Sequence, residues 1–140
     1  MKLTLLAGIA FVFAVTASHA AEFDFATKLL DLDGKPYRDC IKVDRSDPNN
    51  AKCDEWIEHT LGVIAYSALD KPDKDLSVIE QARRAVLARK VYAGTSEKHV
   101  VDLSASEVSL IVTLVGKLQL RPVEFMRVLE ILDPTQLKDK

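Results

Sequence analysis

The hydrophobic pattern predicts two consecutive helices, over residues 104–118 and 122–132. In both segments, large aliphatic residues recur at helical spacing on one face, and polar residues, including Glu124, occupy the opposite face. Ser104 and Glu107 form an S-x-x-E capping box, which is typical of a helix start. These two aliphatic stripes are expected to form the centre of the hydrophobic core.

Two further helices are predicted earlier in the chain, over residues 56–69 and 77–92. The first begins between residues 54 and 60, where Thr60 is a suitable N-cap. The second begins with a capping box formed by Ser77 and Glu80.

The helix over residues 77–92 is apolar on nearly all sides. One possible buried face runs through Val78, Ala82, Ala85 and Val86, and the other runs through Leu87, Ala88, Val91 and Tyr92. The first choice leaves Arg89 amid the core-facing residues, and the second leaves Arg84 there. One arginine is therefore expected to lay its aliphatic stem against apolar surface.

A β-hairpin is predicted over residues 23–43. Asp33-Gly34 and Pro36 are typical turn residues, and apolar and polar residues alternate after them. Since a two-stranded hairpin is marginal alone, it should pack on the helices. The expected fold class is α+β, mainly α, with an N-terminal hairpin against about four short helices in a single small domain over residues 21–140.

Residues 1–20 have the organisation of a secretory signal peptide. A lysine precedes an apolar stretch, and Ala17 and Ala20 supply the small residues that a signal peptidase recognises. Cleavage is therefore predicted between Ala20 and Ala21, giving a periplasmic or secreted protein without a membrane segment. An uncleaved anchor is the alternative, but the apolar stretch is shorter than the roughly 20 residues that span a bilayer.

The charge distribution argues against nucleic-acid binding. The chain has 19 lysines and arginines and 21 aspartates and glutamates, which give a net charge of -2. Removal of the leader takes away one lysine and no carboxylate, so the charge falls from -2 to -3. The basic residues are scattered among acids, whereas a phosphate backbone requires a basic stripe. Neither DNA nor RNA is expected as a partner.

Cys40 and Cys53 are the only two cysteines of the chain. In an exported protein, two such residues predict a structural disulfide, which would contribute about 3 kcal/mol in the chain-entropy model. Free thiols and pairing between molecules are the alternatives. The spacing differs from the C-x-x-C of redox motifs, and a zinc site would need more ligands than His59 nearby.

Asp31, Asp33 and Gly34 suggest a calcium loop, but the surrounding residues do not support one. With Gly34 at the sixth loop position, Leu29 and Cys40 fall where an Asp and a Glu are required. An ordinary turn is predicted instead.

No pattern predicts catalysis, a metal or a cofactor. Glu55 and His59 lie four residues apart and would share a helix face, but a third metal ligand is not near in sequence. His99 ends a loop whose composition is typical of a solvated connection. The glycines are spread singly, so no phosphate-binding loop is indicated. The chain is therefore expected not to be an enzyme.

Several motifs follow one another along the mature chain. They are Leu29-Leu30-Asp31-Leu32-Asp33-Gly34-Lys35-Pro36, Thr60-Leu61-Gly62 with Ala65, Ala68 and Leu69, residues 84–92, Val101-Asp102-Leu103-Ser104 with Glu107 and Ile111, and Leu114-Val115-Gly116-Lys117. In this order they resemble a group of small phage and prophage proteins of uncharacterised function. The resemblance implies no activity and no site residues. This chain departs from the group in its leader and in a longer segment, residues 39–59, which contains both cysteines.

Three functional hypotheses follow from these features. The first is an exported, non-enzymatic protein that binds another protein or an envelope component. The second is a phage-derived assembly or host-interaction factor that stays in the cell or remains tethered by an uncleaved leader; a mature chain that still begins at Met1 would favour it. The third, a hydrolase or metalloenzyme, requires a pocket in which His59 or His99 meets two carboxylates.

Overall fold

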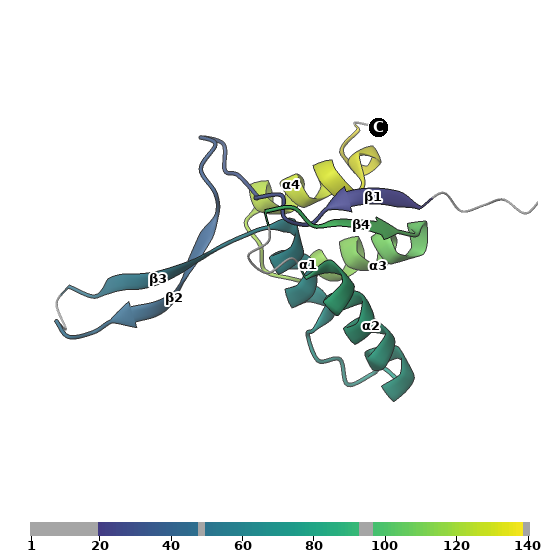
Figure 1. The fold of residues 1–140 in the computed structure, drawn as a ribbon, viewed down its shortest axis with the longest axis horizontal. Helices are drawn as coiled ribbons and strands as arrows, with labels where there is room; N and C mark the ends of the chain where they lie inside the picture. The colour runs from purple at the N-terminus through teal and green to yellow at the C-terminus, as the bar shows by residue number, and fades with distance from the viewer. Residues whose placement is uncertain (1–19, 48–49, 93–96, 139–140) are drawn as a thin grey trace, which may run out of the picture.

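The strands form two separate antiparallel pairs. The computed structural model describes residues 20–47, 50–92 and 97–138, so the predicted leader lies outside the described residues except for Ala20. β1 (Ala21–Asp24) pairs with β4 (Val100–Leu103), and β2 (Arg38–Asp44) pairs with β3 (Lys52–Glu58). Together with the four α-helices found in these described ranges, the strands make a mixed α+β fold (Figure 1), which confirms the predicted class.

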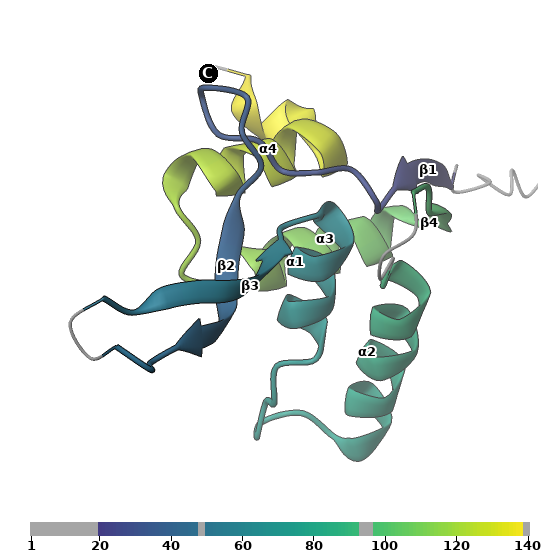
Figure 2. The same cartoon turned by 60° about the vertical axis from the view of Figure 1, so that its left-hand side comes forward.

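The helices form the body of the protein. They are α1 (Leu61–Leu69), α2 (Val78–Val91), α3 (Ala105–Val115) and α4 (Pro122–Leu132), followed by the short 3-10 helix η1 (Pro134–Leu137). α1 contacts both α2 and α3, and α3 contacts α4 (Figure 2). Within the described ranges, none of the helices combines the length and apolar character that membrane crossing requires.

Local side-chain caps fix where three helices begin. Ser77 with Glu80 and Ser104 with Glu107 form the expected capping boxes, and the Thr60 hydroxyl accepts the backbone N-H of Val63 at 3.1 Å.

The capping box of α3 affects the ionisation of Glu107. Partial burial of the Glu107 carboxyl opposes its ionisation. The hydrogen bonds from the Ser104 backbone and hydroxyl, together with the Lys90 ammonium, outweigh burial and hold the pKa of Glu107 below its ordinary value.

The predicted hairpin over residues 23–43 is wrong. The turn is present: Gly34 has a φ of 79°, and the Asp31 carboxylate accepts the N-H groups of Asp33 and Lys35 at 2.9 and 2.8 Å. Only one isolated bridge, between Leu30 and Pro36, flanks it. The first strand instead finds its partner in β4, some eighty residues later in the chain.

The predicted helix over residues 56–69 begins later than expected. Residues 52–58 are strand β3, and the helix starts at Leu61, directly after its Thr60 cap. The hairpin of this fold is therefore β2–β3. Its second strand, β3, overlaps the residues that the sequence pattern assigns to the start of the helix over residues 56–69.

The hydrophobic core lies between the helices and the β1–β4 pair. Its fully buried members come from every part of the body, and the largest are Phe25, Leu29, Leu61, Leu103, Ile111, Val91, Val115 and Val128. The predicted central stripe of α3 is confirmed, because Ile111, Leu114 and Val115 are buried.

Candidate binding arm and its histidine anchor

Strands β2 and β3 form a ribbon that projects from the helical body. The segment over residues 38–58, which comprises these strands and their connection, is called the arm below. Its outer part lies clear of the helices in both views (Figures 1 and 2). Among the described residues, none of the buried core side chains comes from the arm. The arm is therefore an addition to the body and contributes nothing to the body's core.

A disulfide between Cys40 and Cys53 crosslinks the two strands of the arm. The sulfur atoms are 2.02 Å apart and the two Cα atoms 5.8 Å apart, so the pairing that the sequence predicts is present. The register of β2 and β3 shifts on either side of Lys42. Because a two-stranded ribbon is marginal alone, the crosslink supplies stability that the sheet itself lacks.

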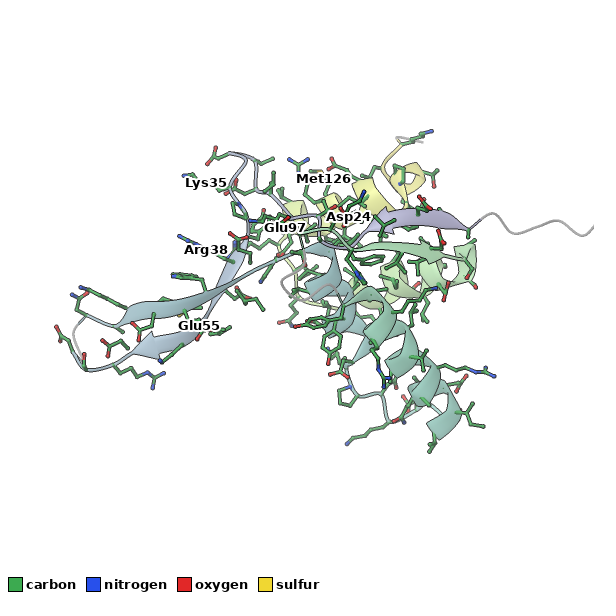
Figure 3. All side chains as sticks on the ribbon, in the orientation of Figure 1. Asp24, Lys35, Arg38, Glu55, Glu97 and Met126 are labelled. Atoms are coloured by element: carbon green, nitrogen blue, oxygen red, sulfur yellow. A yellow bond between two sulfur atoms is a disulfide. The ribbon has the colours of Figure 1, made fainter. Side chains whose placement is uncertain are left out.

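The arm carries large apolar side chains that face solvent. The exposed fractions are 57% for Ile41, 43% for Val43, 47% for Trp56 and 37% for Ile57. The Arg38 guanidinium lies 4.6 Å from the centre of the Trp56 ring, a cation-π contact. Figure 3 shows side chains on both faces of the ribbon. The two faces of the ribbon together therefore expose both apolar and charged side chains.

Three backbone hydrogen bonds close the base of the arm. Leu29 donates to His59, His59 donates to Tyr37, and Tyr37 donates back to Leu29, with N···O distances of 2.8, 2.8 and 2.9 Å. The side chains of Leu29 and Tyr37 are buried in the core. The Arg121 guanidinium also lies 5.2 Å from the centre of the Tyr37 ring. The arm therefore emerges from a fixed point on the body.

His59 anchors this base through both of its ring nitrogens. Nδ1 contacts the Glu124 carboxylate of α4, and Nε2 lies 2.9 Å from the Asp39 carboxylate of β2. His59 and Glu124 are buried, whereas the Asp39 side chain is 64% exposed. Ionised carboxylates only accept hydrogen bonds, so the imidazole must donate from both nitrogens when both acids are ionised. The network ties the arm to α4.

Sequence reasoning placed Glu124 on the polar face of its helix, and this prediction is wrong. The residue is only 3% exposed. Its burial depends on His59, which lies 65 positions away along the chain, and no local pattern reports such a pairing. Glu55 and His59, whose spacing would place them on one helix face, do not share a helix, because Glu55 lies on β3.

A hydrolase or metalloenzyme would require a pocket in which His59 meets two carboxylates. The two carboxylate contacts are present. Both ring nitrogens of His59 are engaged, and the most prominent grooves among the described residues are lined by other side chains. In that same part of the chain, no group of three His, Cys, Asp or Glu residues is placed to hold a metal ion. The contacts of His59 join β2 to α4 at the base of the arm.

His99 and Asp31 also have structural partners. The His99 ring Nε2 lies 2.8 Å from the Lys90 carbonyl, and its backbone N-H donates to Asp24. That hydrogen bond and a second from the Ala26 N-H lower the pKa of Asp24. The Asp31 carboxylate is used by its own turn. The structure does not bring either residue to the arm.

The fold and the arm together define a class: a small α+β protein with a disulfide-crosslinked β-ribbon mounted on a helical body. No family model, curated protein or solved structure matches the chain.

Proposed function

We propose that this chain is an exported, non-enzymatic protein of the cell envelope that binds another protein through the arm. The observation that carries the proposal is the exposure of Ile41, Val43, Trp56 and Ile57 on a ribbon that takes no part in the described core. Apolar side chains of this size on the arm are not needed for the described core. Exposed apolar surface is typical of protein-binding sites.

The construction of the arm suits tight binding. The Cys40–Cys53 disulfide and the His59 anchor restrict the motion of the ribbon before any partner arrives. A surface that is ordered in advance loses less conformational entropy on binding. Trp56 and Arg38 are also residue types that often supply most of the binding energy of an interface.

The strand edges of the arm offer a second means of recognition. In the described part of the chain, β2 and β3 form a sheet of only two strands, so each has an outer edge without a neighbouring strand. An extended segment of another protein can add to such an edge through backbone hydrogen bonds. Specificity would then come from the side chains around Trp56.

The charge of the arm favours a protein over a nucleic acid as partner. Residues 38–58 contain six acidic and four basic residues, so the arm has no excess of positive charge. The Asp44 carboxylate accepts the N-H and hydroxyl of Ser46, which lowers its pKa and favours the ionised form.

Export is supported by two features. The Cys40–Cys53 disulfide is of a kind that persists in oxidising compartments. The leader pattern of residues 1–20 ends where β1 begins, so cleavage after Ala20 would leave every described strand and helix whole. The proposed location is the periplasm or the extracellular space.

Affinity enrichment with matched variants tests the proposal. Immobilised oxidised wild type, Trp56→Ala and Leu32→Ala are each exposed to an envelope fraction of the producing cell. Leu32 is the control because it is 76% exposed but lies outside the arm. Wild type and Leu32→Ala should retain the same partner in equal amounts. Trp56→Ala should retain at most about one tenth of that amount. Equal retention by all three would refute binding through the arm.

A further inference from the structure

His59 lies where the arm meets the body, between two acceptors that differ in their access to water. The side chain of His59 is 11% exposed, that of Glu124 is 3% exposed, and that of Asp39 is 64% exposed. Among the described residues, these two carboxylates are the charged groups that contact the ring. The imidazole therefore has a buried acid of α4 on Nδ1 and an accessible acid of β2 on Nε2.

The other charged groups around the base of the arm have different partners. Glu58, which precedes His59 in the chain, forms an ion pair with Lys28. The guanidinium groups of Arg38 and Arg121 each lie over an aromatic ring. A change in the charge of the imidazole therefore acts first on its own two carboxylates.

The number of protons on the imidazole decides whether both of its contacts can exist together. The imidazolium donates from both nitrogens, whereas the neutral ring donates from one nitrogen and has a lone pair on the other. Since ionised carboxylates only accept hydrogen bonds, a neutral ring can satisfy one acid but not both. Glu124 is buried and cannot exchange the ring for water, so it keeps the N-H of Nδ1. Asp39 is exposed, so it can turn to solvent.

We propose that His59 is a protonation-dependent latch, which holds the arm to α4 when the ring is charged and releases it when the ring is neutral. As the pH rises, a base in the solvent takes the proton of Nε2, and the electron pair of that N-H bond stays on the nitrogen. The lone pair then faces the Asp39 carboxylate, which turns to water. Histidine suits this role because its charge commonly changes near neutral pH.

Release of Asp39 loosens the arm without unfolding the body. Asp39 lies opposite Ile57 in the ribbon, so its contact with His59 is a side-chain link between the ribbon and α4. The backbone hydrogen bonds at the base and the pair of Lys28 with Glu58 do not depend on that contact. The ribbon stays attached through them and gains freedom to pivot. This inference concerns how the arm is held and does not depend on what the arm binds.

A pH titration of the oxidised protein tests the latch. Trp56 is the only tryptophan of the chain and lies on β3, so time-resolved fluorescence anisotropy reports motion of the arm. Nuclear magnetic resonance of the ring nitrogens follows the proton of His59 in the same samples. Loss of the Nε2 proton should coincide with a larger amplitude of fast motion at Trp56. After correction for the intrinsic effect of pH, amide exchange in β2 should become about fivefold faster.

Two variants separate the latch from a general effect of pH. In Asp39→Asn, the side-chain amide can accept from the charged ring or, turned over, donate to the neutral ring, so the arm should stay fixed across the titration. Asp54→Asn is the matched control, since Asp54 is an exposed acid of the arm outside the His59 contacts, and it should respond as wild type does. Circular dichroism at each pH confirms that the proteins are folded.

Three results would overturn the latch. The first is an arm whose motion in wild type does not change while His59 loses its proton. The second is an Asp39→Asn variant with the same response as wild type. The third is a His59 ring whose proton count stays constant over the whole pH range in which the protein is folded.

Discussion

His59 contacts one carboxylate from α4 and one from β2, and these two contacts have unequal energetic weight. Glu124 is buried with the imidazole, so neither group can turn to water if the other is removed. Asp39 is largely exposed, and water can replace its contact with Nε2. The stability of the arm base should therefore depend mainly on the Glu124 contact.

We predict that Glu124→Ala lowers the free energy of unfolding by about 2–4 kcal/mol, since it leaves a buried ring nitrogen without its partner. Asp39→Ala should lower it by less than about 1 kcal/mol. Urea denaturation followed by circular dichroism measures both values. Equal losses in the two variants would contradict the assignment of Glu124 as the principal anchor.

At the residue scale, local chemistry could be predicted and distant pairing could not. Ser77, Ser104 and Thr60 cap their helices, because a cap involves residues only three positions apart. The disulfide was predictable because the chain contains a single pair of cysteines. Glu124 stands at a position that the helical pattern assigns to the polar face. Its burial is explained by its contact with His59, which no local pattern indicates.

At the scale of elements, the arm and the body are separable. Tyr37 and His59 belong to the base, and the backbone bonds between them and Leu29 do not involve the outer ribbon. Among the described residues, the core receives no side chain from the arm. The body should therefore fold without it.

We predict that removal of the outer arm changes the melting temperature by less than about 4 °C. Cys40 and Trp56 are paired across the ribbon, so an Asn-Gly turn can replace residues 41–55, with Cys40→Ser to remove the free thiol. Thermal unfolding followed by circular dichroism measures the effect.

Phe25→Ala is the matched destabilised control for this measurement. Phe25 is fully buried, and its truncation should lower the free energy of unfolding by about 3–5 kcal/mol. A shortened-arm protein that is destabilised as much as Phe25→Ala would show that the arm is part of the folding unit.

Helices were easier to predict than strands for a physical reason. Each helix satisfies its own backbone and carries its start signal within one turn, so α2, α3 and α4 follow from local pattern. A strand requires a partner, and the partner of β1 is β4 in the other half of the chain. The alternation of apolar and polar residues before and after Asp33-Gly34 predicted a hairpin between these two flanking segments. In the fold, a single isolated bridge joins them.

At the scale of the whole molecule, the arm stands apart from the helical body. The arm extends from the body and carries Trp56, Arg38 and open strand edges, which suit a foreign protein.

Site-specific photo-crosslinking in the producing cell tests most directly whether the arm binds a partner. A photoreactive amino acid at Ile41 or Trp56 is predicted to give one discrete adduct with another protein. The same group at Leu32 or Thr113, which are exposed on the body, should not give that adduct. If the body positions capture the partner and the arm positions do not, the arm is not the binding surface.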